Sequence, residues 1–391
     1  MVIVWLCNIM VSSLQIELNR FFQIVNDTTV PMQYITKSAI TQIRGKIRGD
    51  VFRYLNSKLV DYFYSNQSIN LWKGYRLLAV DGTTLKLPKV KQLMDHFTLW
   101  KNRRNNPQAI ARLSVLFDLE NKLIVDAVAG PKSKGEQTLI WDHFHCLKPN
   151  DLVVMDAGYP AAWLFQYLTV NGIQWCMRMK SNSPWWKCVR AFKSSKKQDI
   201  QIRLDIPDSS VKQCQALQIP HDFVMIRLVK IKLPNGEIEI LATSFLDPSV
   251  ITKTHLDELY QKRWGIEESI KELKCRMAMP EFSGKKVNVI YQDIYSKIFV
   301  DNLVSILCIE AQKQVHETTG PRKHDYFVNR TQAIRKTKNV VVRLLLEQNI
   351  RPILQDLIQS ITTDIEPKRR NRKYPRKKFH PRKYFMAYKP V

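Results

Sequence analysis

Two short apolar runs, at residues 77–80 and 152–155, constrain the fold of this chain more than any other feature. Each run has four residues and stops at an aspartate, with a glycine one or two positions further on. A continuous apolar run of this length that ends in a turn is typical of a strand buried on both faces. Such strands occur in sheets that helices cover, so we expect a layered α/β fold.

The segments between and after these runs predict a mixed sheet. Residues 109–119 and 122–129 are strand-like, and the two residues between them predict a hairpin beside the first strand. Helices are predicted at 135–147 and 160–170, the second with a proline in its first turn, and a last strand at 173–179. The order of three strands, helix, strand, helix and strand is a mixed α/β architecture.

Residues 181–249 differ from this pattern and are predicted to form a β-rich insertion. Two apolar runs there flank Asn235 and Gly236, and Asn-Gly is a strong hairpin signal. Helical patterns resume near residue 252. The expected organisation is a helical region (1–72), a core (73–180 and 250–315), the insertion (181–249), a C-terminal helical region (316–365) and a basic tail (366–391).

The charge of the chain predicts a polyanionic partner. Lys and Arg number 61 against 35 Asp and Glu, a formal net charge of +26 over 391 residues. Nucleic acid is the first candidate and an anionic membrane surface the second. The most apolar stretch, residues 1–11, is far shorter than the roughly 20 residues of a membrane-spanning helix. It has no basic segment before it, so we interpret it as the buried start of a helical region and expect no membrane partner.

The seven cysteines and eight histidines do not predict a zinc site or a disulfide framework. The chain has no C-x-x-C pair and no H-x-x-x-H pattern. His143 and His145 stand in a predicted helix and are interpreted as surface residues. Scattered thiols without a signal peptide are typical of a reduced cytosolic protein. Carboxylates are therefore the expected ligands of any metal.

Asp81 and Asp156 are the first candidates for chemistry. Each is predicted to end a buried strand and to precede a glycine-containing turn. Sheets of α/β proteins place ligand-binding groups at the carboxyl ends of their strands. Asp before Gly is also ordinary turn chemistry, so neither aspartate identifies a site by itself.

A helix predicted around Glu267 supplies a third acid. At about 100° per residue, four polar side chains fall within an arc of about 60°; they are Tyr260, Arg263, Glu267 and Lys274. An apolar stripe lies beside this arc and consists of Ile266, Ile270, Leu273 and Met277. The helix would pack through the stripe and present the polar groups along its edge, while Glu268 points elsewhere. Ordinary charge pairs, such as Glu267 with Lys271, explain the charges but not the shared arc.

These residues carry a resemblance to a known family. Tyr-x2-Arg-x3-Glu-x6-Lys, present in full from Tyr260 to Lys274, is the signature of a group of cut-and-paste transposases of the DDE type from bacterial insertion sequences. Residues 78–88 resemble that group's first-aspartate motif and residues 151–159 its second. The resemblance runs from about residue 75 to 299. Ala157 departs from it, since a basic residue is frequent there in the group, and we expect an altered backbone contact without loss of chemistry.

The resemblance implies a ribonuclease-H-like catalytic core in which Asp81, Asp156 and Glu267 bind two Mg²⁺ or Mn²⁺ ions. Two metals roughly 3.5–4 Å apart assist both the attacking and the leaving oxygen of a phosphodiester. Carboxylate oxygens are the ligands that Mg²⁺ prefers. The resemblance also implies that phosphates beside the cut are held by Tyr260, Arg263 and Lys274.

The implied function is that of a transposase. The enzyme would cut double-stranded DNA at the ends of its element and join the freed 3′-hydroxyls to target DNA, in related enzymes through a hairpin intermediate. We expect it to act in the bacterial cytoplasm on nucleoid DNA. A homodimer is expected because two ends must be cut together.

Two basic segments are further candidates for DNA contacts. A helix predicted to be capped by Thr36 or Ser38 opens a stretch with Lys37, Arg44, Lys46, Arg48 and Arg53. This stretch is either the solvated face of a small bundle or a module that binds the element's ends. The tail has eleven basic residues against one acid, and is either a solubilising disordered segment or, as we favour, a segment that binds a polyanion. Its aromatic residues could stack on bases; these are Tyr374, Phe379, Tyr384, Phe385 and Tyr388.

The hairpin step needs a flipped base, which aromatic side chains hold. Trp185 and Trp186 are candidates, although tryptophans in a β-rich segment are usually part of the core. Trp264 is interpreted as a packing residue.

Two alternative functions stay open from the sequence. A metal-dependent nuclease of the same fold would cut DNA without strand transfer. A catalytically inactive DNA-binding derivative would keep the fold without the chemistry.

Overall fold

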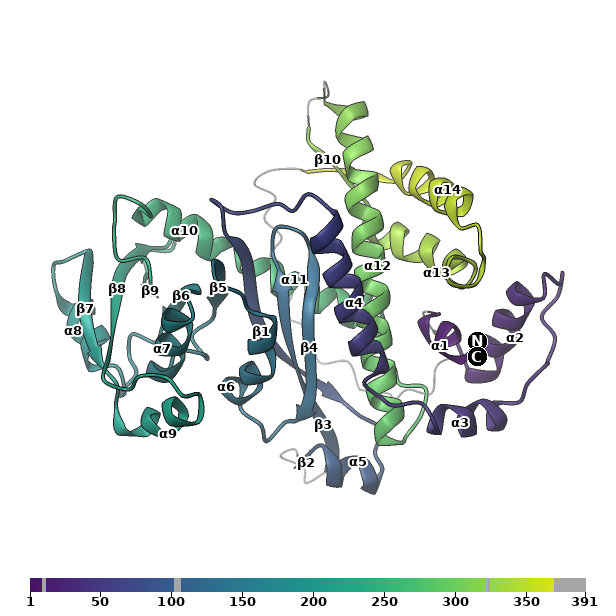
Figure 1. The fold of residues 1–391 in the computed structure, drawn as a ribbon, viewed down its shortest axis with the longest axis horizontal. Coiled ribbons are helices and arrows are strands. Elements are labelled where there is room, and N and C mark those ends of the chain that lie inside the picture. Colours follow the sequence, from purple (N-terminus) through teal and green to yellow (C-terminus); the bar gives the residue numbers. More distant parts are fainter. Residues whose placement is uncertain (9–11, 102–106, 321, 323, 369–391) are drawn as a thin grey trace.

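The computed structural model describes residues 1–8, 12–101, 107–320, 322 and 324–368, and its centre is a nine-stranded mixed sheet (Figure 1). The strands are β1 (Arg76–Lys86), β2 (Leu99–Lys101), β3 (Pro107–Asp118), β4 (Leu123–Pro131), β5 (Asp151–Met155), β6 (Gln174–Met179), β7 (Asp199–Asp205), β8 (Phe223–Lys232) and β9 (Ile238–Thr243).

Five strands, β1, β3, β4, β5 and β6, have the order and directions of a ribonuclease-H-like core. β1 is antiparallel to β3, and β3 is antiparallel to β4. β1 is parallel to β5, and β5 is parallel to β6. The hairpin predicted at residues 109–129 and the mixed α/β fold class are thereby confirmed.

The predicted insertion continues the same sheet. β9 pairs with β6, β8 with β9, and β7 with β8, all antiparallel. The predicted Asn-Gly hairpin joins β8 to β9, and Gly236 has a φ of +86°, which glycine adopts without strain. Two helices also lie in this segment, α8 (Lys187–Ser194) and α9 (Asp208–Ala216).

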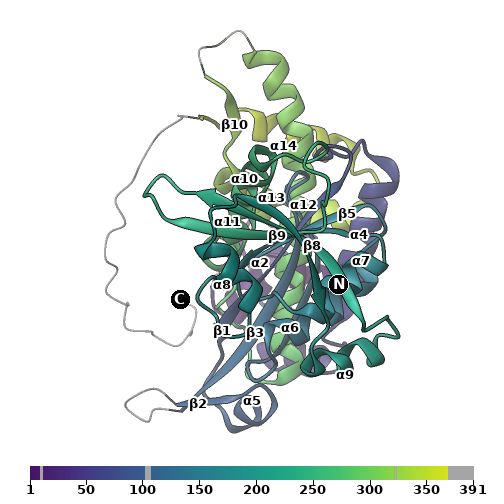
Figure 2. The same cartoon turned by 90° about the vertical axis from the view of Figure 1, so that its left-hand side faces the viewer.

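Residues alternate between two apolar clusters on the two faces of the sheet. Along β1, Leu77 and Ala79 belong to one cluster, and Leu78 and Val80 belong to the other. The first face is covered by α11 (Trp264–Cys275) together with α12 (Val287–Thr319). The second is covered by α7 (Ala162–Val170). Figure 2 shows α11 and α7 on opposite sides of the sheet.

The short helices differ from the predicted ones. Residues 135–147 form α6 (Glu136–Leu139) and then a 3₁₀ helix, η1 (Ile140–Cys146), in place of one α-helix. α7 begins two residues after Pro160, since Ala161 before it has an extended backbone. Another short helix, α5 (Lys91–His96), precedes β2.

The N-terminal residues form four helices, which are α1 (Val2–Cys7), α2 (Leu14–Val25), α3 (Lys37–Gly45) and α4 (Val51–Asn66). Trp5 and Leu6 of α1 are buried, as predicted for this apolar segment. Thr36 caps α3 by accepting a hydrogen bond from the Ala39 N–H at 3.3 Å, again as predicted. α4 packs on α12 and on β4, so the N-terminal region contacts the sheet directly.

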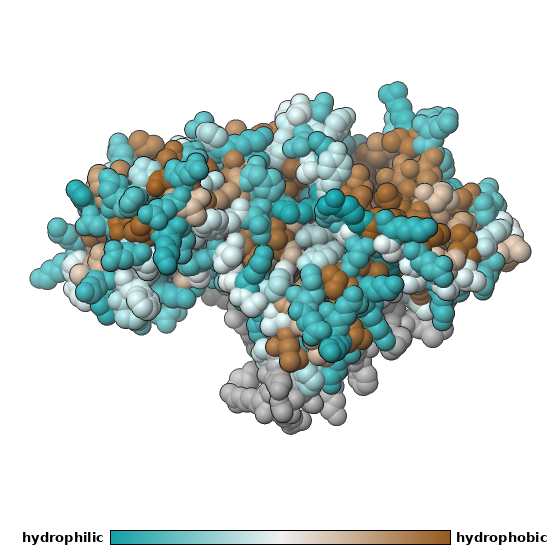
Figure 3. All heavy atoms as spheres, turned by 60° about the horizontal axis from the view of Figure 1, so that its bottom comes forward, coloured by the Kyte–Doolittle hydropathy of each residue, from teal (hydrophilic) through white to brown (hydrophobic). Residues whose placement is uncertain are grey.

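The C-terminal residues are mainly helical. They form α10 (Lys253–Lys262), α11, α12, α13 (Arg330–Leu346) and α14 (Arg351–Thr362), and a small pair of strands, β10 (Tyr326–Val328) and β11 (Ile365–Pro367). No helix among the described residues is long and apolar enough to cross a membrane. Figure 3 shows a mostly hydrophilic face, with apolar patches at the end where the N-terminal helices lie in Figure 1. Residues 369–391, which make up most of the predicted tail, lie outside the described residues.

Candidate active site

Asp81 and Asp156 lie at the same level of the sheet. The parallel pairing of β1 with β5 ends at Val80 and Met155, so each aspartate is the next residue along its chain. Asp156 follows the end of β5, as predicted. Asp81 does not end its strand, contrary to the prediction, because β1 continues to Lys86 through its pairing with β3. The aspartates are thus at the point where β1 extends beyond β5.

The helix that carries Glu267 packs on the face toward which Asp81 points. Leu77 and Ala79 of β1 share one apolar cluster with α11, and Asp81 follows them in the alternation of the strand. The predicted apolar stripe of this helix is buried, with Ile266, Ile270, Leu273 and Met277 all less than 9% exposed. Glu268 is exposed, as the prediction for the helix requires.

The predicted single helix is broken at Arg263. α10 ends at Lys262 and α11 begins at Trp264, while the Ile266 N–H donates to the Arg263 carbonyl three residues back at 3.1 Å. The four signature side chains therefore come from two helices. Arg263 still joins two of its partners, because Nη2 donates to Glu267 Oε1 at 2.7 Å and the guanidinium lies 5.5 Å from the centre of the Tyr260 ring.

Negative charge is concentrated around Asp81. Burial, followed by the negative charges of Asp156 and Glu267, raises the pKa of Asp81 to about 6, while the Gly82 N–H and Arg263 act in the opposite direction. The Gly82 N–H donates to Asp81 Oδ1 at 2.7 Å, and the Gly158 N–H donates to Asp156 Oδ1 at 2.8 Å. The structure thus brings the three predicted acids into one electrostatic group.

Lys274 completes the group of predicted residues. Burial lowers the pKa of its ammonium below the ordinary value, and the nearby Asp81 partly offsets that effect. Lys274, near the end of α11, and Arg263, just before its start, are therefore two cations beside the acids.

Several buried polar atoms at the site have no hydrogen-bond partner among the described residues. They are the hydroxyls of Tyr159 and Tyr260 and the Nε of Arg263. Buried polar groups nearly always form hydrogen bonds, so an unpaired group indicates that its partner is a bound molecule. An anionic ligand such as a phosphate would supply the acceptors that the Tyr260 hydroxyl and the Arg263 Nε lack.

Three residues near the acids have no role in the sequence interpretation. Glu136 of α6 and the buried Tyr159 both lie beside Asp156. Arg178 of β6 pairs with Glu239 at 2.8 Å and acts electrostatically on Tyr260 and Asp156. Arg178 was detectable as a charged residue near the end of a predicted buried strand. Glu136 follows Gly135 at a predicted helix start, which is too common a pattern to mark a site.

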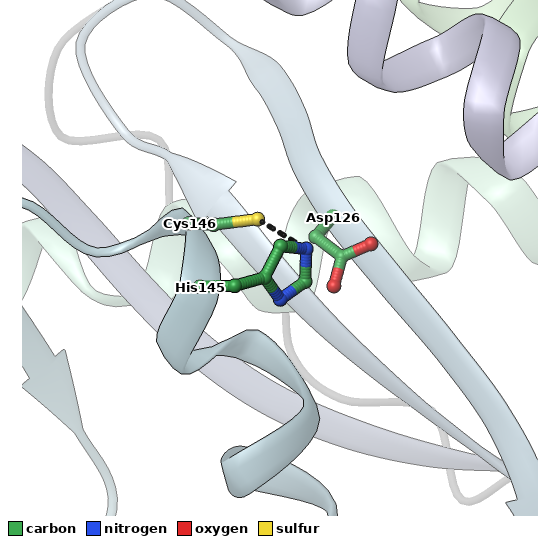
Figure 4. A group of neighbouring side chains, drawn as sticks. All are labelled: Asp126, His145 and Cys146. Atoms are coloured by element: carbon green, nitrogen blue, oxygen red, sulfur yellow. Dashed lines mark hydrogen bonds between the residues drawn. The ribbon is translucent and has the colours of Figure 1, made fainter.

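A second group of potential metal ligands is better explained as structure. Among the described residues, Asp126, His145 and Cys146 have ligand atoms within 4.8 Å of one another (Figure 4). Asp126 is already held by Arg53 at 2.9 and 2.7 Å and by His143 at 2.8 Å. Burial raises the pKa of Cys146 to about 12, which keeps the thiol protonated and a poor ligand.

His143 is a core residue, contrary to its interpretation as a surface residue. Its two ring nitrogens contact Asp126 at 2.8 Å and Ser114 Oγ at 3.0 Å, and its exposed fraction is 0%. The order Ser, His, Asp is that of a hydrolase triad. Ser114 is 1% exposed, so no substrate can reach it and the network is structural. His145 is exposed, as predicted.

The tryptophans also differ from their predicted places. Trp185 is 87% exposed and lines a cavity formed by residues 180–185, so it is not part of the core. Trp186 is half-buried and packs against Phe165. Trp264 is 51% exposed, although Arg263 lies over its ring, so its side chain is only partly packed.

Two of the five N-terminal basic residues pair with buried acids, and a third, Arg48, pairs with the exposed Asp50 at 2.6 Å. Arg44 is buried and pairs with Asp293 at 2.9 Å, and Arg53 pairs with Asp126. These two side chains hold the fold and are not available to DNA. Lys37, Lys46 and Arg48 are exposed.

Comparison with known proteins agrees with this geometry. The family model described as "Transposase DDE domain" matches residues 72–303, which is more than half of the chain. The chain is 23% identical to the transposase InsG for insertion sequence element IS4 of Escherichia coli (strain K12) over 370 residues, which are 90% of this chain and 80% of that protein. It is also 22% identical over 149 residues to the putative transposase InsZ of the same organism, and spans half of its length.

Among solved structures, the piggyBac transposase synaptic complex with hairpin DNA has a TM-score of 0.42 and 12% identity to this chain, and the match covers 73% of this chain and 57% of that chain. The extent of the family match decides the assignment. The chain belongs to the transposase DDE-domain family of bacterial insertion sequences, whose members are metal-dependent phosphoryl-transfer enzymes.

Proposed function

We propose that Asp81, Asp156 and Glu267 hold two divalent ions, Mg²⁺ or Mn²⁺, and that this site cuts DNA at the ends of the element and joins it to target DNA. The observation that supports this most strongly is the common level of Asp81 and Asp156, with Glu267 acting on Asp81 from α11. Asp81, within β1, and Asp156, just after β5, thereby stand next to each other, and Glu267 acts on Asp81 from α11.

The residues present suit such ions. All three ligands offer hard carboxylate oxygens, which Mg²⁺ and Mn²⁺ prefer. Burial and the charges of Asp156 and Glu267 raise the pKa of Asp81, and a bound cation would stabilise its charged form. When bound, two such ions activate the attacking oxygen and stabilise the leaving oxygen of a phosphodiester.

The cationic side chains would hold the DNA backbone beside the cut. Arg263 neutralises Glu267 through Nη2 and keeps its buried Nε free of any described acceptor. Charge-assisted bonds from a guanidinium to phosphate oxygens are strong and directional. Lys274 would add a second cation and the Tyr260 hydroxyl a neutral donor. In the first step water attacks phosphorus and the 3′-oxygen leaves. In the second step the freed 3′-hydroxyl attacks the phosphorus of another phosphodiester, whose own 3′-oxygen leaves.

Trp185 is the side chain best placed to stack on a flipped base. It is largely exposed and follows β6, the strand next to β5 and Asp156. A base that stacks on an aromatic ring recovers part of the energy lost on leaving the duplex. Trp186, which packs on Phe165, would hold residues 180–185 in place.

The rest of the chain would organise the DNA complex. We propose that residues 1–72 bind the element's ends through Lys37, Lys46 and Arg48, and that residues 366–391 add sequence-independent affinity. Residues 73–180 and 250–315 would form the catalytic core, with 181–249 as the insertion and 316–365 as a helical support. Action as a homodimer on nucleoid DNA in the cytoplasm fits two ends cut together and a net charge of +26.

A joining assay tests this function. A labelled duplex carrying one end of the element is incubated with protein, Mg²⁺ or Mn²⁺ and a supercoiled target plasmid. We expect cleaved ends and, in addition, label joined to the plasmid. Cleaved ends without joined product would indicate a nuclease, and DNA binding without cleavage would indicate an inactive derivative.

A further inference from the structure

Glu136 stands at the junction of the two aspartate-bearing strands, although it lies on neither. A Cβ atom added at Gly158 would lie 3.0 Å from Glu136 Oε2 and 3.0 Å from Asp156 Oδ1. The two oxygens are both 3.0 Å from one point, so they are at most 6.0 Å (twice 3.0 Å) apart. A Cβ at Gly82, the residue after Asp81, would lie 3.6 Å from Glu136 Oε1. The Glu136 carboxylate therefore lies against both aspartate turns.

This position is fixed by a neighbour in α6. Gln137 Nε2 donates to the carbonyls of Gly158, Tyr159 and Pro160 at 3.4, 3.2 and 3.4 Å. These bonds tie the start of α6 to the loop that follows Asp156. The closeness of Glu136 to Asp156 is therefore built into the fold.

A buried hydroxyl beside these acids points to a missing ligand. The Tyr159 phenol is 0% exposed, and its oxygen has no hydrogen-bond partner among the described residues. Burial and then the charges of Asp81, Glu136 and Asp156 raise its pKa, so the hydroxyl lies near all three carboxylates. Arg112 also acts on this phenol, but no hydrogen bond from a described residue reaches the Glu136 carboxylate.

We infer that Glu136 is a fourth oxygen ligand of the metal site, directly or through a bound water. This inference rests on the proposed assignment of Asp81, Asp156 and Glu267. Side chains alternate along β1, so a side chain at Gly82 would point to the face opposite to that of Asp81. Because Glu136 lies beside this position, it approaches from the face of the sheet opposite to α11. Two ions roughly 3.5–4 Å apart need ligands on more than one side, and Glu136 supplies the side that Glu267 cannot reach.

A purely structural role for Glu136 predicts a different outcome. An acid in the first turn of a helix stabilises the helix dipole, which changes stability by a fraction of a kcal/mol and leaves metal affinity unchanged. Metal binding by the free protein therefore separates the two roles without any measurement of DNA cleavage.

The experiment is a titration of the full-length protein with Mn²⁺ alone, followed by water-proton relaxation, for the wild type, Glu136→Gln, Glu267→Gln and the control Glu268→Gln. Glu268 is exposed and adjacent to Glu267, so its variant makes the same charge change outside the site. We expect Glu136→Gln to weaken Mn²⁺ binding by about 10-fold to 100-fold, as loss of a ligand or its immediate support does. Glu268→Gln should bind as the wild type does.

The outcomes separate the two claims. Weaker binding in Glu267→Gln with unchanged binding in Glu136→Gln would overturn this inference and leave the proposed function intact. Unchanged binding in Glu267→Gln, or no binding by the wild type, would overturn the proposed metal site and this inference with it. Glu136→Asp keeps the charge but withdraws the carboxylate by one methylene, and should show an intermediate loss. Thermal melts without metal verify that each variant is folded.

Discussion

Val80 of β1 is paired with Met155 of β5 as the last rung of their parallel ladder. The residue after each of them is an aspartate, so the sheet itself brings Asp81 and Asp156 to one level. α11 then adds Glu267 from the face that Asp81 shares with Leu77 and Ala79. The proposed catalytic group thus depends on strand register and helix packing and not on a flexible loop.

The raised pKa of Asp81 predicts a pH-dependent cost to stability. The folded state holds the Asp81 proton more tightly than the unfolded chain, so stability falls as pH rises from about 4 to the folded-state pKa of about 6. Asp81→Asn should therefore raise the free energy of unfolding at pH 7.5 in EDTA, by on the order of 1–2 kcal/mol after solvent screening. At pH 4 the difference should be small. Denaturant melts at both pH values test this, with the exposed Asp142→Asn as control; an equal gain at both would contradict it.

Gly158 is expected to tolerate no side chain. An added Cβ would lie 3.0 Å from the oxygens of both Asp156 and Glu136, which must then move. Gly158→Ala should reduce metal-dependent cleavage by about 10-fold to 100-fold, since displaced ligands weaken metal sites by such factors. Gly45→Ala is the control, because nothing lies within 4 Å of a Cβ there. Equal cleavage rates for the two variants would show that the site adapts to the added methyl group.

Arg44 is expected to stabilise the fold and not to contact DNA. It is 2% exposed and bonds to Gln292, Ser283 and Asp293. Arg44→Met removes one partner of a buried ion pair, which should lower the free energy of unfolding by about 3–5 kcal/mol. Arg48→Ala, at a side chain that is 84% exposed, should leave the free energy of unfolding nearly unchanged. Chemical denaturation measures both, and a small effect of Arg44→Met would refute the structural role.

Trp185 should affect the hairpin step without affecting the fold. Because the side chain is 87% exposed, Trp185→Ala should change the free energy of unfolding by less than about 0.5 kcal/mol. Loss of base stacking costs about 1–3 kcal/mol, so hairpin formation should slow by about 5-fold to 160-fold while first-strand cleavage persists. Trp185→Phe should retain part of the activity. If Trp185→Ala forms hairpins at the wild-type rate, another residue stacks on the flipped base.

The α/β architecture and the packing face of α11 could be predicted from the sequence, because they follow from local patterns. Four-residue apolar runs predict buried strands, and the stripe from Ile266 to Met277 predicts the face through which α11 packs. Features set by tertiary contacts could not be predicted. β1 continues past Asp81 because β3 pairs with it, and His143 is buried because it forms hydrogen bonds with Asp126 and Ser114. Glu136 reaches the site through Gln137 and its bonds to a distant loop, which no local pattern reveals.

The most direct test of the three-carboxylate mechanism is cleavage of DNA carrying the element's own ends, in Mg²⁺ or Mn²⁺, by the wild type, Glu267→Gln and Glu268→Gln. We predict that the wild type and Glu268→Gln cut, and that Glu267→Gln binds the same DNA but cuts at least about a thousandfold more slowly. Cleavage by Glu267→Gln at a rate close to that of the wild type would contradict the mechanism.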